Sequence, residues 1–217
     1  MASHEFRTPL TSINSSADLI KLYLEKGNND GIQKHIGTIQ GSVQHVHKLL
    51  EDFLSVTKLE ENRIELYPTK INVEELLKEV ITELEMQLKD GQSISFSSLG
   101  KDLISNTDQN IIKNIFYNLI TNAIKYSEEN KSIEVHLNRI GDEITVKIKD
   151  QGIGIPKAEQ KFMFSRFFRA SNTIGIKGTG LGLNIVKDYL DMLNSKIEFE
   201  SEEGVGSTFL VSLSDME

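Results

Sequence analysis

Apolar residues recur along the first part of the chain at alternating steps of four and three. Such spacing places one apolar stripe along one side of a helix. A first stripe predicts a helix running to about Gly27, and a second predicts a helix over about residues 31–60. The stretch Gly27–Gly31 between them is rich in residues that favour turns. The stripes consist of Phe6, Leu10, Ile13, Ala17, Ile20 and Leu24, and of Ile32, Ile36, Ile39, Val43, Val46, Leu50 and Phe53.

A lone helical hairpin with one such stripe on each helix cannot bury both stripes well. Two hairpins can bury all four stripes together in a four-helix bundle. We therefore expect residues 1–60 to form a homodimer, with residues 61–67 as a linker to the remainder of the chain.

From Pro68 onward the pattern becomes one of mixed helices and strands. Asn72 with Glu75 three residues later is typical of a helix start, and this helix would reach about Lys89. Further helices are expected over 108–126 and 180–194, and strands over 93–99, 133–137, 144–148, 197–199 and 209–213. This order, with a hairpin turn at Gly141, indicates an α+β fold in which residues 68–217 form a two-layer α/β sandwich.

Composition narrows the possible classes of function. The 217 residues carry a net charge of −8, which argues against a nucleic-acid partner because phosphate contacts need clustered Lys and Arg. The chain has no cysteine, which excludes disulfides and thiolate metal sites and fits a reducing compartment. No apolar run is long enough to cross a bilayer, so we expect a cytoplasmic segment without membrane contact. The start of the chain resembles an excised piece, and a longer protein could be tethered to a membrane through a missing N-terminal region.

His4 is the first candidate for chemistry. It lies off the apolar stripe, with Glu5 beside it and Thr8 one helical turn later on the same face. A neutral imidazole is a good nucleophile toward phosphorus, and a nearby carboxylate can hold its other proton. Taken alone, however, a histidine in such a setting is more often just a solvated residue on a helix surface.

A row of asparagines is the second candidate. Asn114, Asn118 and Asn122 follow one another at steps of four on the helix expected over 108–126. Amide oxygens can bind Mg²⁺, and Lys125 close by could reach a phosphate as a point charge. Taken alone, such a row more often serves helix packing or capping.

Two glycine clusters make up the third candidate. Asp150-Gln-Gly152-Ile-Gly154 follows a strand, and glycines there let the backbone approach a ligand closely while Asp150 can accept a hydrogen bond from an amine. Gly178-Thr-Gly180-Leu-Gly182 opens a helix, so free amides and the helix dipole would face an anion. Neither cluster fits the Rossmann fingerprint, and the chain has no P-loop. Singly, these are weak signals.

Together, in their order and spacing, the motifs resemble those of the sensor histidine kinases of two-component signalling. Residues 3–10, Ser-His-Glu-Phe-Arg-Thr-Pro-Leu, resemble the H-box, with Phe6 where many members carry Leu. The asparagine row, the two glycine clusters, Phe164–Arg169 and Gly204–Phe209 resemble the N, G1, G2, F and G3 boxes of the ATP-binding domain, a fold of the Bergerat type.

The resemblance implies a role for each matching residue. His4 would accept the phosphoryl group, Glu5 would act as its base, and Thr8 would position a water for dephosphorylating the partner regulator. Arg169 would stabilise the transferred phosphate, and residues 170–179 would form a mobile lid. ATP and Mg²⁺ would be held by Asn118 and Asn122 as magnesium-side residues, by Lys125, Tyr126, Asp150, Gly152, Gly154, Ile155, Gly178, Gly180, Leu181 and Gly182, and by Thr208 as support for Asp150.

The favoured function is therefore an ATP-dependent protein histidine kinase that passes phosphate from His4 to an aspartate of a response-regulator receiver, with a possible reverse phosphatase activity. The sequence leaves two alternative functions open. One is an ATPase of the related chaperone and mismatch-repair class, against which residues 1–60 count. The other is a non-enzymatic dimerisation module in which the glycines only form turns.

Overall fold

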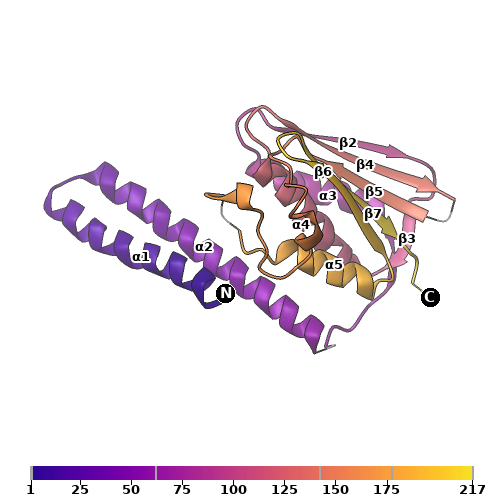
Figure 1. Cartoon of the computed structure of the whole chain (residues 1–217), viewed down its shortest axis with the longest axis horizontal. Coiled ribbons are helices and arrows are strands. Elements are labelled where there is room, and N and C mark those ends of the chain that lie inside the picture. Colours follow the sequence, from indigo (N-terminus) through magenta and orange to yellow (C-terminus); the bar gives the residue numbers. More distant parts are fainter. Residues whose placement is uncertain (1, 62, 142, 177, 217) are drawn as a thin grey trace. The chain divides into compact units, whose positions relative to one another are not determined.

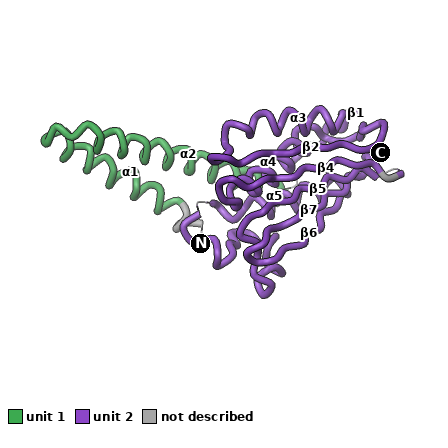
Figure 2. Tube along the Cα trace, turned by 90° about the horizontal axis from the view of Figure 1, so that it is seen from above, with its two compact units in different colours: residues 1–63 green, residues 64–217 purple. Residues whose placement is uncertain are grey.

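The computed structural model of the chain (Figure 1) describes residues 2–61, 63–141, 143–176 and 178–216, with the side chains of 2–5 and 140 left aside. The chain divides into two compact units, residues 1–63 and residues 64–217 (Figure 2). Within the described residues, no helix is both long and apolar enough to span a membrane.

The first unit is a helical hairpin of α1 (Ala2–Glu25) and α2 (Asn29–Glu60), as the apolar stripes predict. Gly27 turns the chain with a φ of +65°, and the Asn28 side chain caps α2 by accepting from the Gly31 amide at 3.0 Å. Near this turn the rings of Tyr23 and His35 stack with centroids 5.5 Å apart. These contacts fix the pairing of the two helices.

The hairpin leaves much of its apolar surface uncovered. Leu10 is 50% exposed and Val43 is 52% exposed, although both belong to the predicted stripes. Ser16 and Ser42 are buried instead. Exposed large apolar side chains in helical register are what remains when a helical surface has no packing partner.

The described residues of the second unit form two sheets and three longer helices. Its elements are β1 (Thr69–Asn72), α3 (Val73–Leu84), η1 (Glu85–Gln87), β2 (Ser93–Leu99), β3 (Ile104–Thr107), α4 (Gln109–Tyr126), β4 (Ser132–Ile140), β5 (Glu143–Lys149), η2 (Gln160–Phe162), η3 (Ser171–Thr173), α5 (Gly182–Met192), β6 (Lys196–Glu202) and β7 (Gly206–Leu213). β1 pairs with β3, and the larger sheet has the order β2-β4-β5-β7-β6. Among the strand pairs that the structure describes, β2 and β4 run parallel and the others are antiparallel.

Helices α3, α4 and α5 lie against one face of the large sheet (Figure 1), which confirms the two-layer α/β sandwich. Along β4, β5 and β7 apolar buried residues alternate with more exposed, mostly polar ones, so these strands present one apolar face for the helices to cover. The buried strand residues include Ile133, Val135, Leu137, Ile144, Val146, Ile148, Phe209, Val211 and Leu213.

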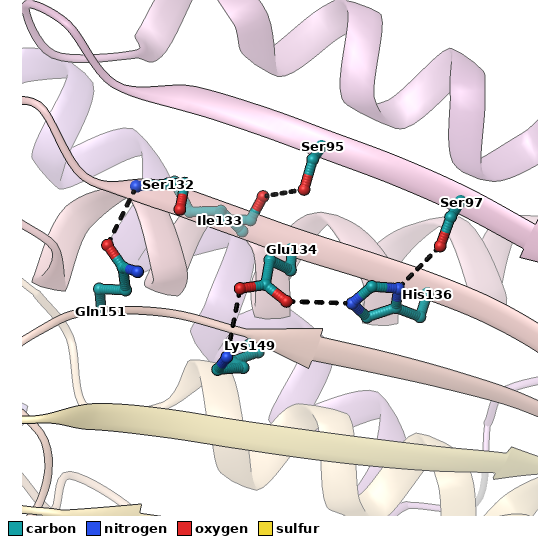
Figure 3. A network of polar contacts seen from close by, with 8 residues as sticks. All are labelled: Ser95, Ser97, Ser132, Ile133, Glu134, His136, Lys149 and Gln151. Carbon is teal, nitrogen blue, oxygen red and sulfur yellow. Dashed lines mark hydrogen bonds and ion pairs between the residues drawn. The ribbon is translucent and has the colours of Figure 1, made fainter.

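The other face of the sheet carries polar side chains (Figure 3). Glu134 accepts from His136 Nε2 at 3.2 Å and from Lys149 Nζ at 3.2 Å, while His136 Nδ1 lies 2.7 Å from Ser97 Oγ. The hydrogen bond from His136, followed by that from Lys149, lowers the pKa of the Glu134 carboxyl. This cross-strand network is compatible with an uncovered, solvated sheet face.

Some boundaries differ from the sequence prediction. The helix that starts after Asn72 ends at Leu84 and continues as a short 3₁₀ turn, so Lys89 lies outside it. α5 begins at Gly182 instead of Gly180. Strands β1 and β3, of four residues each, were not predicted, because four residues give too little alternation to recognise.

Asp108 joins the chain before β1 to the start of α4. Its carboxylate is 4% exposed; Oδ1 accepts from the Asn110 amide at 3.0 Å and the Ile111 amide at 3.1 Å, and Oδ2 accepts from the Tyr67 amide at 3.0 Å. One side chain therefore caps α4 and also anchors the segment leading to β1.

We expect Asp108→Ala to destabilise the second unit by about 2–3 kcal/mol, because three amides lose a buried charged acceptor. Asn72→Ala removes an exposed cap from α3 and should cost about 1 kcal/mol. Urea denaturation of the whole chain, monitored by circular dichroism, would compare the two variants. Equal losses would show that the bond to Tyr67 contributes no stability.

Candidate nucleotide-binding site and phosphoacceptor

Asn118, in the middle of the asparagine row, faces the beginning of α5. Asn118 is 8% exposed, and its Nδ2 donates to the carbonyl oxygen of Asn114 at 2.9 Å and to the side-chain oxygen of Asn114 at 2.6 Å. The Asn118 oxygen thus points the other way: a Cβ added at Gly182 would lie 3.1 Å from it. Asn122 is half-buried, and its side-chain amide has no hydrogen bond to the residues that the structure describes.

Lys125 lies beside the second glycine cluster. Its Nζ is 3.0 Å from the hydroxyl of Tyr126 and 4.5 Å from the centre of that ring. A Cβ added at Gly178 would come within 2.3 Å of the Lys125 Nζ. The structure therefore brings the last turn of α4 and the glycines of 178–182 together, although they are far apart in sequence.

At the entry into α5 the Leu181 amide donates to Thr179 Oγ1 at 3.2 Å, and the N-cap residue itself supplies no capping side chain. Gly180 has a φ of +69°, and an added Cβ would meet the backbone of Phe167 at 2.8 Å, so only glycine fits there. Leu181 is buried at the N-cap position, and no side chain caps the first turn of α5. Uncapped amides and the helix dipole at this end favour an anion.

Asp150 is a buried carboxylate at the end of β5. It is 8% exposed, and its Oδ1 accepts from the amides of Gly152 at 2.8 Å and Ser207 at 3.1 Å. Burial raises the pKa of the Asp150 carboxyl, while the two backbone hydrogen bonds act in the opposite direction. A carboxylate kept in such a place is able to accept a hydrogen bond from a ligand amine.

The loop after Asp150 is packed between two other segments. The amide of Ile153 donates to the Tyr126 carbonyl at 3.2 Å, and an added Cβ at Gly152 would lie 2.7 Å from that same oxygen. Gly154 has a φ of +60° and approaches the Glu202 carbonyl so closely that a Cβ would stand 1.9 Å from it. Ile155 is buried. The loop is thereby joined both to the end of α4 and to the end of β6.

No hydrogen bond joins the Thr208 side chain to Asp150 among the described residues. The cross-strand partner of Thr208 is Lys149, which lies on the polar face of the sheet (Figure 3), whereas Asp150 takes its hydrogen bond from the amide of the buried Ser207. The alternation of β7 contains the signal: Ser207 shares a face with Phe209, and Thr208 does not.

Arg169 is held by the segment that follows it. Its guanidinium NH2 group donates to the Thr173 carbonyl at 3.1 Å and to the Ile176 carbonyl, and its buried Nε has no hydrogen-bond partner among the described residues. Asn172 from the same segment donates to the Gly154 carbonyl at 3.0 Å. The expected lid is therefore connected to both Arg169 and the Asp150 loop.

The phosphoacceptor candidates lie on α1. The backbone of His4 and Glu5 is helical, but their side chains lie outside the described residues. Thr8 is exposed one turn later, and Pro9 follows it within the helix.

Comparison with known families decides what these features belong to. Residues 107–216 match the family described as "Histidine kinase-, DNA gyrase B-, and HSP90-like ATPase". Residues 1–62 match the "His Kinase A (phospho-acceptor) domain". The chain belongs to the sensor histidine kinases. It comprises the helical phosphoacceptor part and the ATP-binding part of such a kinase, as the order of the motifs predicts.

Individual histidine kinases agree with this assignment. Sensor protein kinase WalK from Staphylococcus aureus is 32% identical over 97% of the chain. The chain spans 51% of that relative, and 35% of WalK from the Newman strain. The structure of histidine kinase AdeS from Acinetobacter baumannii shares the fold, with a TM-score of 0.77 at 20% identity, covering 99% of this chain and 98% of that one. Histidine kinase ThkA, solved in complex with the response regulator protein TrrA, gives a TM-score of 0.77 at 26% identity, covering 99% of this chain and 60% of that one.

The buried Asp150 of this kinase core gives a test of the site. Because the folded state holds the Asp150 proton more tightly than the unfolded chain does, the free energy of unfolding should fall as pH rises from the ordinary carboxyl pKa of 3.8 to the raised folded value. Asp150→Asn removes this titration. We expect the stability difference to grow in favour of the variant across that pH window, while ATP binding weakens.

Urea denaturation at a series of pH values, with nucleotide titration at neutral pH, would check both parts. The contributions of the other carboxyls to the pH dependence are the same in both proteins and cancel in the difference. Parallel stability curves for wild type and variant would contradict the raised pKa.

Proposed function

We propose that this chain transfers the γ-phosphoryl group of ATP to His4 and then to an aspartate of a response-regulator receiver. The observation that carries the proposal is the meeting of Asn118 and Lys125 with the glycines at the start of α5. In the first step the bond between the γ-phosphorus and the bridging oxygen breaks, a phosphorus–nitrogen bond forms at His4, and ADP leaves.

The adenine end of the nucleotide belongs at the Asp150 loop. Asp150 accepts a hydrogen bond from the exocyclic amine, and Ile155 and Tyr126 pack near the base. Gly152 and Gly154 allow the close packing that places this loop, since neither position has room for a Cβ. Ser207 takes the supporting role first expected of Thr208, through its amide to Asp150.

The phosphate end belongs between α4 and α5. The amides of Gly180, Leu181 and Gly182 face the phosphates together with the positive end of the α5 dipole, and for this the Leu181 amide has to exchange Thr179 Oγ1 for a phosphate oxygen. Lys125 contributes a point charge, next to the close approach of Gly178.

A magnesium ion fits the oxygens of the asparagine row. The side-chain nitrogen of Asn118 donates to Asn114, and the side-chain oxygen of Asn118 is therefore directed toward Gly182. Hard amide oxygens, with Asn122 one turn further, suit Mg²⁺. When bound, the ion neutralises charge on the phosphates, and Asn118 and Asn122 would hold it there.

Transfer to the acceptor uses residues of both units. Arg169 stabilises charge on the transferred group, for which its guanidinium has to exchange the carbonyls of Thr173 and Ile176 for phosphate oxygens. Glu5 holds the proton of His4, and Thr8 positions water for the reverse hydrolysis on the regulator. The complex of the similar kinase ThkA with a response regulator protein supports the same class of partner here. We infer a cytoplasmic location for this segment.

Labelling with γ-³²P ATP and magnesium tests the central step. We expect acid-labile, base-stable label on the wild type and none on His4→Gln, because the glutamine has no nucleophilic nitrogen. His4→Gln should still bind nucleotide, whereas Asn122→Ala should lose magnesium-dependent binding by about tenfold or more.

Label that persists in His4→Gln would refute His4 as the acceptor. Unchanged nucleotide affinity in the Asn122 variant would show that the magnesium side of the site is misplaced. Nucleotide binding by both variants therefore separates the two parts of the proposal.

We further propose that the hairpin dimerises through its uncovered apolar stripes. Val43→Asp places a charge on the stripe and should shift the chain from dimer to monomer in sedimentation experiments at micromolar concentration. Gln44→Asp adds the same charge to the neighbouring exposed position and serves as the control. A Val43 variant that sediments like the control would exclude this face as the interface.

A further inference from the structure

The last four carbonyls of α4 all have partners. A helix end leaves four carbonyl oxygens without an intrahelical donor, and a buried end must satisfy them in another way. Here Ala123 O accepts from Ser127 N at 3.1 Å, Ile124 O from Gln92 Nε2 at 3.1 Å, Lys125 O from Lys89 Nζ at 2.8 Å, and Tyr126 O from Ile153 N at 3.2 Å. Two of the four partners are thus side chains of the loop between α3 and β2.

Gln92 is the more buried of these two side chains. It is 8% exposed, and its Nε2 also donates to the carbonyls of Ser127 at 3.0 Å and Glu128 at 2.9 Å. Its Oε1 accepts from the Lys89 amide at 3.0 Å, which fixes the amide so that its nitrogen faces α4. Both ends of the Gln92 amide are therefore hydrogen-bonded, and its nitrogen holds the backbone at and just after the end of α4. We call this contact the clamp.

Lys89 adds a charge to the same helix end. Its Nζ donates to the carbonyls of Lys125 and Ser127 from an exposed position. A cation at the C-terminus of a helix is also favoured by the helix dipole. The backbone supports this docking, since the Asn130 amide donates to the Asp90 carbonyl at 3.0 Å.

The clamped turn connects the two halves of the candidate site. Lys125, at the phosphate end, belongs to this turn of α4. Its neighbour Tyr126 accepts from Ile153, in the loop that follows Asp150 at the adenine end. A displacement of the turn would therefore move the adenine loop and the phosphate lysine with respect to each other, and small misplacements of binding groups are costly.

We propose that Gln92, assisted by Lys89, is a positioning residue for nucleotide binding. It acts through the carbonyls of the α4 end and sets the spacing between the Asp150 loop and Lys125. This inference rests on the proposed function, because it assumes that these groups bind the two ends of one nucleotide.

Gln92→Glu tests the clamp with a side chain of the same shape. It replaces the donating nitrogen with an oxygen that faces three carbonyls, which is repulsive in a buried place. We expect the dissociation constant for ATP and the KM for autophosphorylation to rise about tenfold, with the labelling rate at saturating ATP changed less than about twofold. Lys89→Met should raise KM about threefold, and Lys89→Arg should restore it.

Asn72→Ala is the matched control for a general loss of stability. It removes side-chain hydrogen bonds to backbone at another helix end of the same unit, away from the candidate site. We expect a lowered Tm without a change in KM. Binding would be measured with a fluorescent ATP analogue in the whole chain, well below the Tm of each variant.

The outcomes separate this inference from the proposed function. Binding by wild type with an unchanged affinity in Gln92→Glu and Lys89→Met would overturn the positioning role alone. A wild type that binds no nucleotide would overturn the proposed function and this inference with it. If Gln92→Glu does not fold, the exposed Lys89 decides: an unchanged KM in Lys89→Met refutes the clamp, and a raised KM restored by Lys89→Arg supports it.

Discussion

The second unit depends on how α4 is held at its two ends. A buried helix must find partners for its first amides and last carbonyls. α4 finds the first in its own N-cap side chain and the second in side chains that lie more than thirty residues away in the sequence. Asp108 closes the N-terminal end and Gln92 with Lys89 closes the C-terminal end. Because α4 packs under the sheet with fully buried residues such as Ile112 and Phe116, its position is set both along its axis and toward the sheet.

The site uses this fixed helix as its frame. The Asp150 loop bonds to the Tyr126 carbonyl, and Gly178 and Gly182 approach Lys125 and Asn118. The retention of a buried carboxylate at Asp150 is unfavourable for folding in itself, as its raised pKa indicates. Its two backbone hydrogen bonds offset part of that cost. A carboxylate that is buried despite the cost of its desolvation is best explained by a ligand that hydrogen-bonds to it.

Periodicity was sufficient to predict the helices and most strands, because long amphipathic segments carry their pattern in every turn. It was insufficient for β1 and β3, which are held by pairing to each other over only four residues. At the site, glycines and asparagines could be recognised as a set, since their spacing is local. The contact of the Ser207 amide with Asp150 was not predicted, although strand alternation places Ser207 on the buried face. Gln92 could not have been found, because the carbonyls it binds are more than thirty residues away and a backbone acceptor has no sequence signature.

The end of α1 that carries the proposed acceptor, His4, is subject to a different constraint. Pro9 has no amide hydrogen, so the Glu5 carbonyl lacks its usual helical donor directly after His4. The turn that carries the proposed acceptor therefore has one helical hydrogen bond fewer and depends more on packing of the stripe residues. Leu10, next to Pro9, is half exposed in the single hairpin. A second hairpin packed over Leu10 would stabilise this turn through apolar contacts. The order of the turn at the proposed acceptor His4 would then depend on dimerisation as well as on helix propensity.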